Sequence, residues 1–572
     1  MSQLRLLCRF LGLTTTAALV AGICSSSGAD DHDIRPRSSA ADLSQPRQTS
    51  GRLVPCGDGD GDGFIATDCG GDDCDDTDLE IHPGAIDWCG DGIDQDCSGA
   101  DLNCATDHSE LDWRGPGTCV ACHSDEAVDV HQSVMYQWQG DAPLMTNGGP
   151  RQGKDRGGVN SYCVHILGNW AGCGSCHIGL GALPSEDPNL DQLKNIDCLL
   201  CHQEEYRRRR DGADWVPDTA AMTITMDEAV KTTHRPVRSN CLQCHAKSGG
   251  GDAVKRGDLA LAQIDTTDRD FDVHMSVTGA DLLCQNCHRV NDHRFEGKGS
   301  DLRPSDTATT VECSRCHPDK ATSWGHDDEE IGRHVDRVAC QTCHIPFYAK
   351  DAGDTTASEA TETHRTWLDT AGNQPPIHPA SRKANNLIPS YRHWNGTSWN
   401  AVLELPVYVN PDNGRYPTSF PEGDVADPDA KLYAFKYKTA VQPMADSNGR
   451  LIALDTSVFF ATGDAEAAVH QGLVNMGLDP DQPVSWIETE THQMLNHQVA
   501  DHDDALECED CHESTTRMDL QGELGYELNG PQSVVCTQCH GNEGNPDFYE
   551  VHDEHVEDRH IDCARCHNFS RD

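Results

Sequence analysis

The sequence predicts a mostly irregular fold of short α-helices and few strands, around an interior that side chains alone do not fill. The chain has 572 residues, of which 36% are hydrophobic and 6% aromatic, whereas a globular protein usually has about 45–50% apolar residues. It also has 29 cysteines, most of which stand in one repeated pattern. A chain of this length contains roughly three or four structural units, so we expect other material to fill much of the core.

The repeated pattern is C-x-x-C-H, which occurs ten times. Two thiols one helical turn apart can bond the two vinyl groups of one haem, and the adjacent histidine then lies under the ring and binds the iron. Zinc ribbons and thioredoxin-like pairs also use neighbouring cysteines, but neither requires a histidine after every second cysteine. The motifs therefore predict ten covalently bound c-type haems, which also explain the lean composition.

Each motif supplies two haem-binding cysteines and one proximal iron ligand. The cysteines are Cys119, Cys122, Cys173, Cys176, Cys198, Cys201, Cys241, Cys244, Cys284, Cys287, Cys313, Cys316, Cys340, Cys343, Cys508, Cys511, Cys536, Cys539, Cys563 and Cys566. The proximal histidines are His123, His177, His202, His245, His288, His317, His344, His512, His540 and His567.

Every iron also has a sixth coordination position, and twenty of the 30 histidines remain to fill it. Two histidine ligands close the iron and suit electron transfer, whereas an open position suits catalysis. About half of these histidines should be ligands and the rest surface residues in polar loops, and distal ligands come from elsewhere in the fold, so pairs stay unassigned. The candidates near motifs are His131, His274, His293, His326, His334, His497, His502, His552, His555 and His560.

Residues 1–29 have the features of a secretory signal peptide. A mostly apolar run from Phe10 to Ile23 is too short to cross a bilayer, and small residues at 27–29 offer a cleavage point. A lipid anchor at Cys24 is disfavoured, because Ile23 stands where such sites have a small residue. No later stretch is apolar enough for a membrane helix, so we expect a periplasmic, extracellular or cell-surface protein in an oxidising compartment.

The net charge of −50 excludes several classes of partner. The chain has 94 acidic against 44 basic residues, whereas nucleic-acid binding and docking on an anionic membrane need basic surfaces. The acidic surface permits cation binding. It is also compatible with a basic redox partner protein or an extracellular electron acceptor such as an oxidised mineral.

Residues 52–104, after a linker at 30–51, form a separate acidic segment. Asp58, Asp60 and Asp62 precede a glycine at alternate positions, an arrangement that converges carboxylates on a hard cation. The twelfth position of a calcium loop is here Cys69, so the segment is not an EF-hand.

Six cysteines make this segment more than a solvated acidic linker. Their even number can close three disulfides. The segment resembles the Asp/Cys-rich metal-binding modules of exported and surface proteins, and we expect a small disulfide-stapled module that binds Ca²⁺ in a stabilising or adhesive role. The cysteines are Cys56, Cys69, Cys74, Cys89, Cys97 and Cys104.

One cysteine is left over. The motifs use twenty, the leader holds Cys8 and Cys24, and the acidic module holds six, so only Cys163 remains of the 29. An unpaired cysteine in an oxidising compartment is either buried and inert or chemically employed. The count alone favours inert burial.

The motifs divide the rest of the chain into three parts. Residues 110–345 hold motifs 1–7, and residues 506–572 hold motifs 8–10. The insertion at 346–505 contains no motif. In it, ELPVYVN at 404–410 and KLYAFKYKTAVQPM at 431–444 predict short strands joined by polar loops.

Seven segments, in this order, resemble the octahaem tetrathionate reductases over roughly residues 110–520. That family is related to multihaem nitrite reductases and hydroxylamine oxidoreductases, and its members are built around haem stacks with helices and few strands. The acidic module and motifs 9 and 10 lie outside the resemblance. The segments are VHQSVMYQW, NSYCVHILGNWAGCGSCH, NIDCLLCH, GGGDAVKRGDL, DVHM, RVACQTCHIPFYAK and NHQVA…CEDCH.

The resemblance implies that the second haem, at Cys173–His177, is the active one, with a lysine nitrogen instead of a second histidine on its iron. It places that lysine at Lys255, with Asp252 one turn earlier, and it makes Cys163 a site residue. Without it, Lys255 is better explained as an exposed lysine in a glycine-rich loop. Asp252 could hold the lysine amine, and a Cys163 thiolate could attack a sulfur–sulfur bond.

Two functions are expected from the sequence. In the first, the chain is an exported ten-haem cytochrome whose haems transfer electrons, with a reductase site for tetrathionate, nitrite or hydroxylamine at the second haem. The alternative is a non-enzymatic extracellular conduit, as a monomer, homo-oligomer or filament subunit, with all haems six-coordinate.

Overall fold

The structure is a computed structural model that describes residues 57–103, 107–162, 165–297, 305–317, 329–354, 360–512 and 516–528, with residues 326, 551, 555, 559, 561 and 565–568. Its contacts separate Met1–Pro55 from Cys56–Asp572, and only the second unit is described below. The signal peptide and the linker lie outside the described residues. So do Cys56, Cys104, Cys163, Cys536, Cys539, His540, His552, His560 and Cys563.

Eight motifs begin or lie on short helical turns. The histidine N–H donates to the carbonyl of the first cysteine at 2.8–3.2 Å in the motifs of His123, His177, His202, His288 and His317. The predicted placement of two cysteines one turn apart is therefore confirmed for these motifs. The turns are α1 (Gly117–Val120), α4 (Trp170–Cys173), α6 (Leu199–His202), α8 (Arg238–His245), α9 (Cys284–Cys287), η5 (Cys313–Arg315), α11 (Cys340–His344) and α14 (Cys508–His512).

The remaining helices are also short, and four two-stranded hairpins or ribbons lie between them. The helices are α2 (Ser124–His131), α3 (Val134–Gln137), α5 (Leu190–Lys194), α7 (Met226–Lys231), α10 (Glu329–Arg337), α12 (Thr456–Thr462) and α13 (Ala465–Asn475). Single 3-10 turns are η1 (Thr67–Cys69), η2 (Lys154–Arg156), η3 (Ile166–Gly168), η4 (Leu261–Ile264) and η6 (His502–Asp504). The paired strands are β1 (Gln139–Asp141) with β2 (Arg151–Gly153), β3 (Arg208–Asp211) with β4 (Asp214–Pro217), β5 (Val290–Asn291) with β6 (Arg294–Phe295), and β15 (Glu527–Leu528) with β16 (His567–Asn568).

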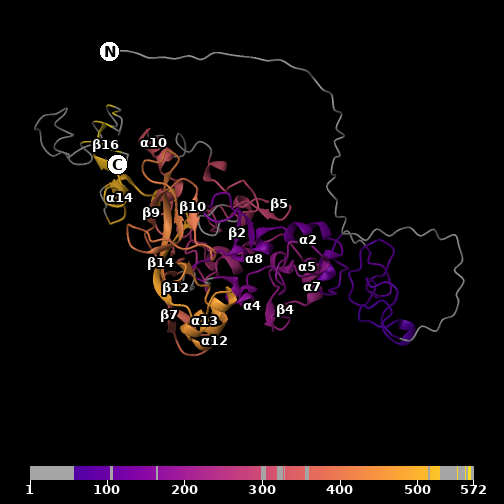
Figure 1. The fold of residues 1–572 in the computed structure, drawn as a ribbon. Helices are drawn as coiled ribbons and strands as arrows, with labels where there is room; N and C mark the ends of the chain where they lie inside the picture. The colour runs from indigo at the N-terminus through magenta and orange to yellow at the C-terminus, as the bar shows by residue number, and fades with distance from the viewer. Residues whose placement is uncertain are drawn as a thin grey trace, which may run out of the picture. The chain divides into compact units, whose positions relative to one another are not determined.

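The insertion between motifs 7 and 8 folds into an eight-stranded sheet. The main order is β10-β11-β14-β12-β7-β8, and β9 and β13 also pair with β12. Figure 1 shows these strands running together, with α12 and α13 at one end. The strands are β7 (Thr361–Ala371), β8 (His378–Ala384), β9 (Ser390–Trp394), β10 (Ser398–Asn400), β11 (Tyr416–Pro421), β12 (Lys431–Ala445), β13 (Arg450–Leu451) and β14 (Val484–Met494).

Strand β12 is the centre of this sheet. It pairs antiparallel with β14 from Phe435↔Met494 to Ala445↔Val484, and parallel with β7 at Thr439↔His364. One face carries polar and charged side chains that are fully buried, among them Lys436 and Lys438. A buried polar face requires partners from other segments, and the segments that supply them are described below.

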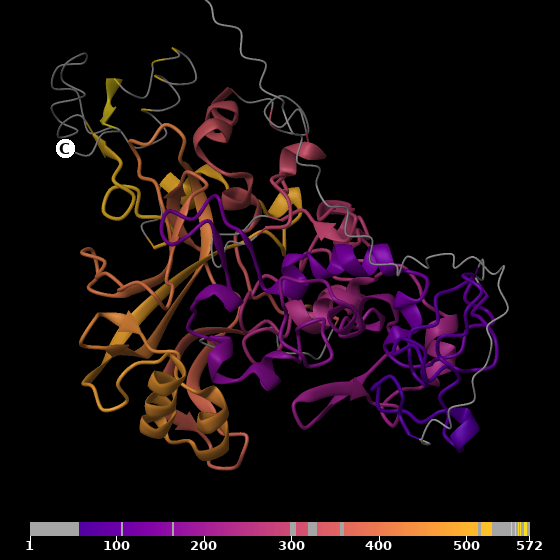
Figure 2. The ribbon, with the colours of Figure 1, turned by 45° about the vertical axis from the view of Figure 1, so that its right-hand side comes forward.

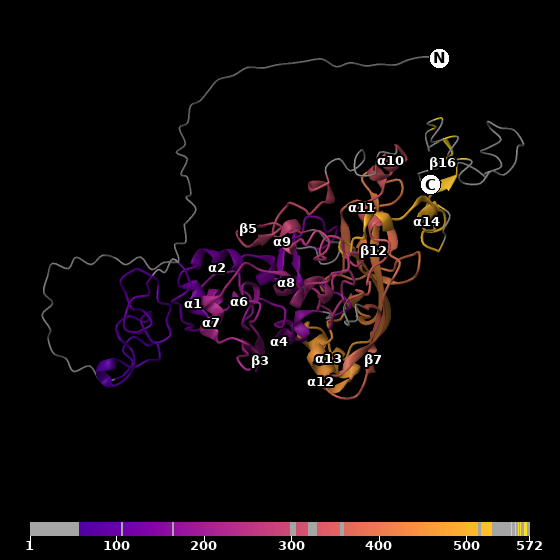
Figure 3. The ribbon, with the colours of Figure 1, turned by 180° about the vertical axis from the view of Figure 1, so that it is seen from behind.

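Apolar residues close the end of the sheet near α12 and α13. Trp367 of β7 packs edge-on against Phe459 of α12 at 5.3 Å between ring centroids, and Leu473 of α13 belongs to the same cluster. Asp455 and Asp464 accept hydrogen bonds from the first N–H groups of α12 and α13, which stabilises their starts. The turned views in Figures 2 and 3 show both helices at this end of the strands.

The insertion differs from its prediction in two ways. The segment 431–444 is a strand as expected, but β12 has 15 residues and the sheet joins strands from the whole insertion. Residues 404–410 are not a strand, because turns and backbone bonds such as Val407 N–H to Gly449 O occupy them. Among the described helices, none is long and apolar enough to cross a membrane.

Candidate functional site

Six motif histidines face a second histidine ring at a common distance. Two imidazoles on one iron have centroids about 6.3 Å apart, because a metal–nitrogen bond is about 2.0 Å long and the centroid lies about 1.15 Å farther on. The centroid distances here are 5.9–6.3 Å, so each pair leaves room for one iron. The pairs are His108–His123, His202–His293, His274–His317, His288–His497, His326–His344 and His334–His512.

Backbone carbonyls orient some of these rings. The Nδ1 atoms of His202 and His288 lie 3.0 and 2.9 Å from the carbonyls of His234 and Glu296. A carbonyl can only accept, so Nδ1 carries the proton and Nε2 keeps its lone pair for a metal. Both rings are therefore in the tautomer that an iron ligand needs.

The distal partner His497 is oriented by a carboxylate. Its Nδ1 lies 3.1 Å from Oδ2 of Asp258, a fully buried residue. Burial raises the pKa of Asp258, but the charges of Arg256 and His497 outweigh it and keep the pKa well below the usual value. The carboxylate therefore stays ionised and fixes the His497 ring, as expected of an outer-shell partner of a ligand.

Five of the predicted distal candidates lie in these pairs, namely His274, His293, His326, His334 and His497. His108 was missed. It stands just before motif 1, in the segment that joins the acidic module to the first haem-binding turn. Like the other candidates, His108 lies close to a motif, so the same criterion could have identified it.

The other candidates lie elsewhere. His131 is buried against Tyr136 at 5.2 Å between centroids. His502 is exposed, and its ring nitrogens lie 2.5 and 3.1 Å from carboxylate oxygens of Asp501 and Asp503. The Nδ1 atom of His555 lies 2.8 Å from Val551 O.

Among the described motif histidines of the octahaem-like part, His177 and His245 do not face a second histidine ring. His177 is fully buried, and its ring lies 4.9–5.3 Å from those of Trp170, Tyr136 and Trp138. His245 is exposed, yet desolvation by the surrounding segments, followed by the charges of His288, Arg256 and Lys255, lowers its pKa to about 4.

The hydrogen bonds of His177 are the reverse of those of His202 and His288. Its Nδ1 accepts from the N–H of Gly179 at 3.0 Å, and its Nε2 lies 2.5 Å from the carbonyl of Tyr136. The proton is therefore on Nε2, which donates to that carbonyl, and neither nitrogen has a free lone pair. Burial lowers the pKa of His177 to about 4, so the ring stays neutral near pH 7.

Lys255 stands in a tightly turned loop. Gly249, Gly250 and Ala253 all have positive φ, at 86°, 107° and 55°. A side chain at Gly249 would place Cβ 3.0 Å from Cβ of Lys255 and 3.0 Å from Cδ1 of Tyr162, so only glycine fits this contact. The loop therefore brings Lys255 against the segment that Cys163 follows.

Asp252 and Cys163 are only partly placed relative to Lys255. Asp252 accepts from the N–H of Leu261 at 2.9 Å, while its Oδ2 is buried without a hydrogen-bond partner among the described residues. Burial raises the pKa of Asp252. Cys163 lies outside the described residues, and the bond between Asp252 and the Lys255 amine stays a prediction.

The described neighbours of Cys163 are buried. Tyr162 has its hydroxyl 3.1 Å from Lys255 O and 3.1 Å from Oε1 of Gln493. His165 is 4% exposed, its Nδ1 accepts from Leu167 N–H at 3.1 Å, and its Nε2 has no described hydrogen-bond partner. Burial lowers the pKa of His165 to about 3.

Thiols of different motifs shift one another's pKa, which indicates which motifs are neighbours. Hydrogen bonds between thiols link motifs 1 and 3, 2 and 4, 4 and 5, and 6 and 7, and the charge of one thiol on another links 3 and 4, 5 and 6, and 7 and 8. Neighbouring motifs therefore form the series 1-3-4-5-6-7-8, with motif 2 beside motif 4. The pairs are Cys119–Cys198, Cys176–Cys244, Cys241–Cys284, Cys313–Cys340, Cys201–Cys241, Cys287–Cys316 and Cys343–Cys508.

A cavity beside motifs 1 and 3 fits a large apolar group. Its volume is about 450 Å³, and Cys119 and Cys198 line it together with Trp113, Tyr206 and Trp215. A flat apolar macrocycle attached through thiols suits this lining.

The acidic module has the expected staples and carboxylates. Cys74 and Cys97 form a disulfide with each other, and Cys69 and Cys89 each take part in a disulfide. Ligand oxygens of Asp58, Asp60 and Asp62 all lie within 4.8 Å of one another. Burial, followed by the charges of Asp62 and Asp73, raises the pKa of Asp60. A bound cation would offset the repulsion between these carboxylates.

A second carboxylate group was not predicted. Oxygens of Asp87, Asp94 and Asp96 also lie within 4.8 Å of one another, and burial raises the pKa of Asp87 to about 6. Arg114, just before motif 1, lies 2.7 Å from Asp96. This ion pair joins the module to the first haem-binding segment.

Known proteins share both parts of this arrangement. Residues 378–515 match a family model described as "Cytochrome c bacterial", and residues 73–101 match one described as "Putative metal-binding motif". The crystal structure of an octaheme cytochrome c from Shewanella oneidensis is similar with a TM-score of 0.60 and 26% identity, over 74% of this chain and 94% of that one. The chain has a multihaem cytochrome c fold.

A curated relative matches a smaller part of this cytochrome. An uncharacterized protein of Archaeoglobus fulgidus is 26% identical over 249 residues, which are 33% of this chain and 82% of that protein. The fold makes the chain a multihaem c-type cytochrome related to octahaem cytochromes, with covalently bound haem c and electron transfer as its general activity. The predicted resemblance and fold class are confirmed, whereas the haem count and a reductase site belong to the proposal below.

Proposed function

We propose that this cytochrome is exported, carries ten haems, and delivers electrons to a reductase site at the second motif. Its substrate there is tetrathionate or another small inorganic oxidant, such as nitrite or hydroxylamine. The observation that carries the proposal is the state of His177, whose ring nitrogens both bond to the backbone. The proposal therefore departs from the sequence prediction, in which His177 is the proximal ligand: here an iron at this motif needs another protein ligand in its place, and Lys255 is the candidate.

Two features of the chain favour Lys255. Its loop is held against Tyr162, which precedes the second motif in sequence, and motif 2 lies beside motif 4, whose His245 feels the charge of Lys255. An amine is a weaker and more easily displaced ligand than imidazole. A haem so ligated would supply electrons next to an exchangeable position, which the six histidine pairs do not offer.

The remaining chemistry falls to protein groups. A Cys163 thiolate attacks the central sulfur–sulfur bond of tetrathionate, forms a cysteinyl thiosulfonate and releases the first thiosulfate. Two electrons then break the new sulfur–sulfur bond, which releases the second thiosulfate and restores the thiolate. Asp252 holds the Lys255 amine in place while the substrate is bound.

The order of motifs supports an electron route to this site. Motif 2 branches from motif 4, which lies inside the 1-3-4-5-6-7-8 series. Electrons that enter at either end of the series can therefore reach motif 4 and pass to motif 2. The two further motifs at the C-terminus extend this route toward a redox partner protein or an extracellular acceptor.

The conduit remains the second candidate, because six of the first eight motifs already have the spacing of closed, bis-histidine irons. In that case the protein conducts electrons as a monomer, an oligomer or a filament, and its second haem is six-coordinate and inert.

Electron paramagnetic resonance of the haem-loaded protein separates the two functions. Spectra are recorded with and without tetrathionate, nitrite and hydroxylamine for the parent protein and for Lys255→Ala. The control is Lys231→Ala, whose amine lies 3.0 Å from Asp112. The proposal expects one signal that responds to a substrate and changes only in Lys255→Ala. Uniform low-spin signals that ignore substrate and both substitutions would identify a conduit.

A further inference from the structure

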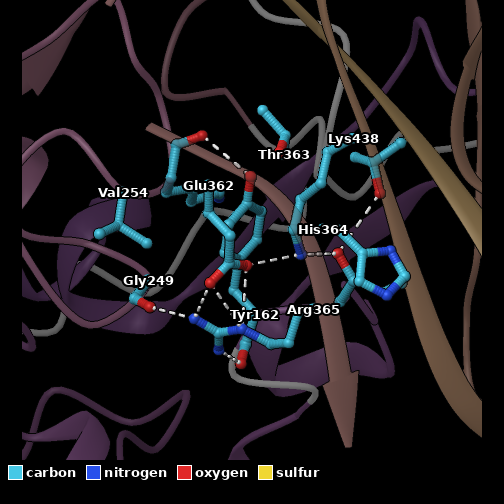
Figure 4. Close-up of polar contacts among 12 residues, drawn as sticks. Tyr162, Gly249, Val254, Glu362, Thr363, His364, Arg365 and Lys438 are labelled. Carbon is cyan, nitrogen blue, oxygen red and sulfur yellow. Dashed lines mark hydrogen bonds and ion pairs between the residues drawn. The ribbon is translucent and has the colours of Figure 1, made fainter. Parts of the chain in front are cut away.

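The inserted sheet contacts both segments of the proposed site through one side chain. From β7, Arg365 donates from Nη1 to the carbonyl of Tyr162 at 2.5 Å and from Nη2 to the carbonyl of Gly249 at 2.8 Å. Tyr162 immediately precedes Cys163, and Gly249 opens the loop of Lys255. Figure 4 shows the guanidinium between these two carbonyls.

Two further buried charges fix the direction of this guanidinium. Glu362 accepts from Nε of Arg365 at 2.9 Å and from Nη2 at 2.8 Å. Lys438, on neighbouring β12, lies 3.0 Å from Glu362 and donates to the hydroxyl of Ser161 at 2.7 Å. The side chains of Lys438, Glu362 and Arg365 are 0%, 1% and 9% exposed, so solvent scarcely screens the network.

The same face of the sheet also forms hydrogen bonds directly with the loop that contains Lys255. Lys436 donates to the carbonyls of Val254 and Lys255 at 2.9 and 2.8 Å. Burial, followed by the charge of Lys438, holds the pKa of Lys436 well below its usual value. Glu362 contributes its own backbone N–H to Val254 O at 3.2 Å.

Stability alone does not account for this network. Three charges in a nearly dry sheet carry a desolvation cost that well-packed apolar residues would avoid, and buried ion pairs are better explained where they fix a specific geometry. The two segments they hold need such support, because Gly249 and Ala253 have left-handed φ values and the Tyr162 segment is not part of a regular element. Every cation in the network donates to one of these two segments.

We propose that Arg365, oriented by Glu362 and Lys438, is a positioning residue that holds the Lys255 loop and the Ser161–Tyr162 segment at a fixed separation beside the second motif. The inference rests on the proposed function, because it assumes that Lys255 and Cys163 act there. It assigns a role to the motif-free insertion, which supplies the frame on which the site is assembled. Arginine is needed because its planar fork can bind both carbonyls and a carboxylate at once, which lysine cannot do.

The test is Arg365→Lys in the haem-loaded full chain, which keeps the charge and removes the fork. We expect the Lys255-dependent paramagnetic signal to shift or broaden, and kcat for tetrathionate to fall about tenfold to a hundredfold, as small misplacements of reacting groups do. The KM should change far less, because Arg365 does not touch the substrate. Glu362→Gln, which leaves the guanidinium without its carboxylate, should give the same change, and it decides the matter if Arg365→Lys does not fold.

The matched control is Glu490→Gln on β14 of the same sheet. Glu490 is also fully buried, but it bonds to Asn410, Asn413 and Tyr437 and to neither site segment. The control should lower the thermal stability and leave the signal and kcat unchanged.

Two results would overturn the inference. One is an unchanged signal and kcat in Arg365→Lys while Lys255→Ala abolishes both, which leaves the proposed function standing. The other is an equal effect in Glu490→Gln, which would make the change a general loss of stability. If Lys255→Ala itself alters neither signal nor rate, the proposed function fails first.

Discussion

The bonds of single histidine nitrogens separate the motifs into two kinds. His202 and His288 hold their protons on Nδ1 and turn Nε2 toward a partner ring, whereas His177 uses both nitrogens for backbone bonds. The identical pentapeptide pattern therefore has different chemical states in different places. Because the difference depends on Tyr136 O and Gly179 N–H, the motif alone could not predict it.

We expect the stability of the folded protein to depend on pH through His165. Its folded-state pKa is about 3, against about 6.5 in the unfolded chain. Below pH 6.5 the unfolded chain therefore binds a proton that the folded protein does not, so the contribution to stability is full above that pH and is lost as the pH falls toward 3. Thermal unfolding of the parent and of His165→Gln between pH 7 and 4 should show a smaller loss in the variant; equal slopes would contradict this.

A second residue-scale prediction concerns Gly249. Gly249→Ala should destabilise the Lys255 loop by about 1–2 kcal/mol from the left-handed backbone alone, with an added cost from the 3.0 Å contacts to Lys255 and Tyr162. Denaturant unfolding measures the loss. The control Gly396→Ala has a similar φ of 92° but no neighbour within 4 Å, so it should cost less. Equal costs would show that the contact does not matter.

At the scale of elements, a hairpin turn places one predicted iron ligand. Asp292 and His293 both have left-handed φ, at 48° and 55°, between β5 and β6. Two such residues are typical of the tight turns that suit hairpins. The turn holds His293 opposite His202, at 6.3 Å between centroids.

His293→Met should therefore raise the reduction potential of one haem, because methionine with histidine favours the reduced iron. Spectroelectrochemical titration measures the shift. His502→Met is the matched control, since His502 is exposed and contacts the carboxylates of Asp501 and Asp503 instead of facing a motif histidine. An equal shift in both variants, or none in His293→Met, would remove His293 from the ligand set.

The acidic module makes its own prediction. Removing Ca²⁺ with a chelator should lower the melting temperature of the first transition, and Asp60→Asn should weaken Ca²⁺ binding, because Asp60 stands among the carboxylates of Asp58 and Asp62. Binding should also weaken as the pH falls, since the pKa of Asp60 is raised and protons compete for it. Luminescence of bound Tb³⁺ that is equal in the parent and the variant would contradict a site at these residues.

The sequence predicted these elements unevenly. The helical turns of the motifs were predictable because C-x-x-C-H fixes local geometry, and Asp58, Asp60 and Asp62 because their spacing is local too. The sheet was underestimated, since the 11 pairs between β12 and β14 join residues far apart in the chain. For the same reason nothing in the sequence indicated that Arg365 would reach both Tyr162 and Gly249.

For the whole molecule, the order of the motifs in space differs from their order in the chain. The contact of Cys119 with Cys198 and of Cys176 with Cys244 interleaves the first four motifs. The spacing of the motifs along the sequence cannot reveal that motifs 1 and 3, and motifs 2 and 4, are neighbours in space. The arrangement sets motif 2 aside from the main series, as the proposed reductase site at this motif requires.

Removal of the two C-terminal motifs should leave the arrangement of the first eight motifs unchanged. A chain ending after Leu528 keeps motifs 1–8, including all six histidine pairs and the Arg365 network. We expect mass spectrometry to find two fewer haems and the second-motif signal to be unchanged. Loss of that signal would mean that the terminal segment also shapes the site.

A structure of the haem-loaded protein, determined by crystallography or electron cryomicroscopy, tests the central claim most directly. We expect the amine of Lys255 on the second iron, with His177 Nε2 still bonded to the carbonyl of Tyr136. An iron held by His177 Nε2 and faced by a second histidine would contradict this, and the second motif would then serve conduction only.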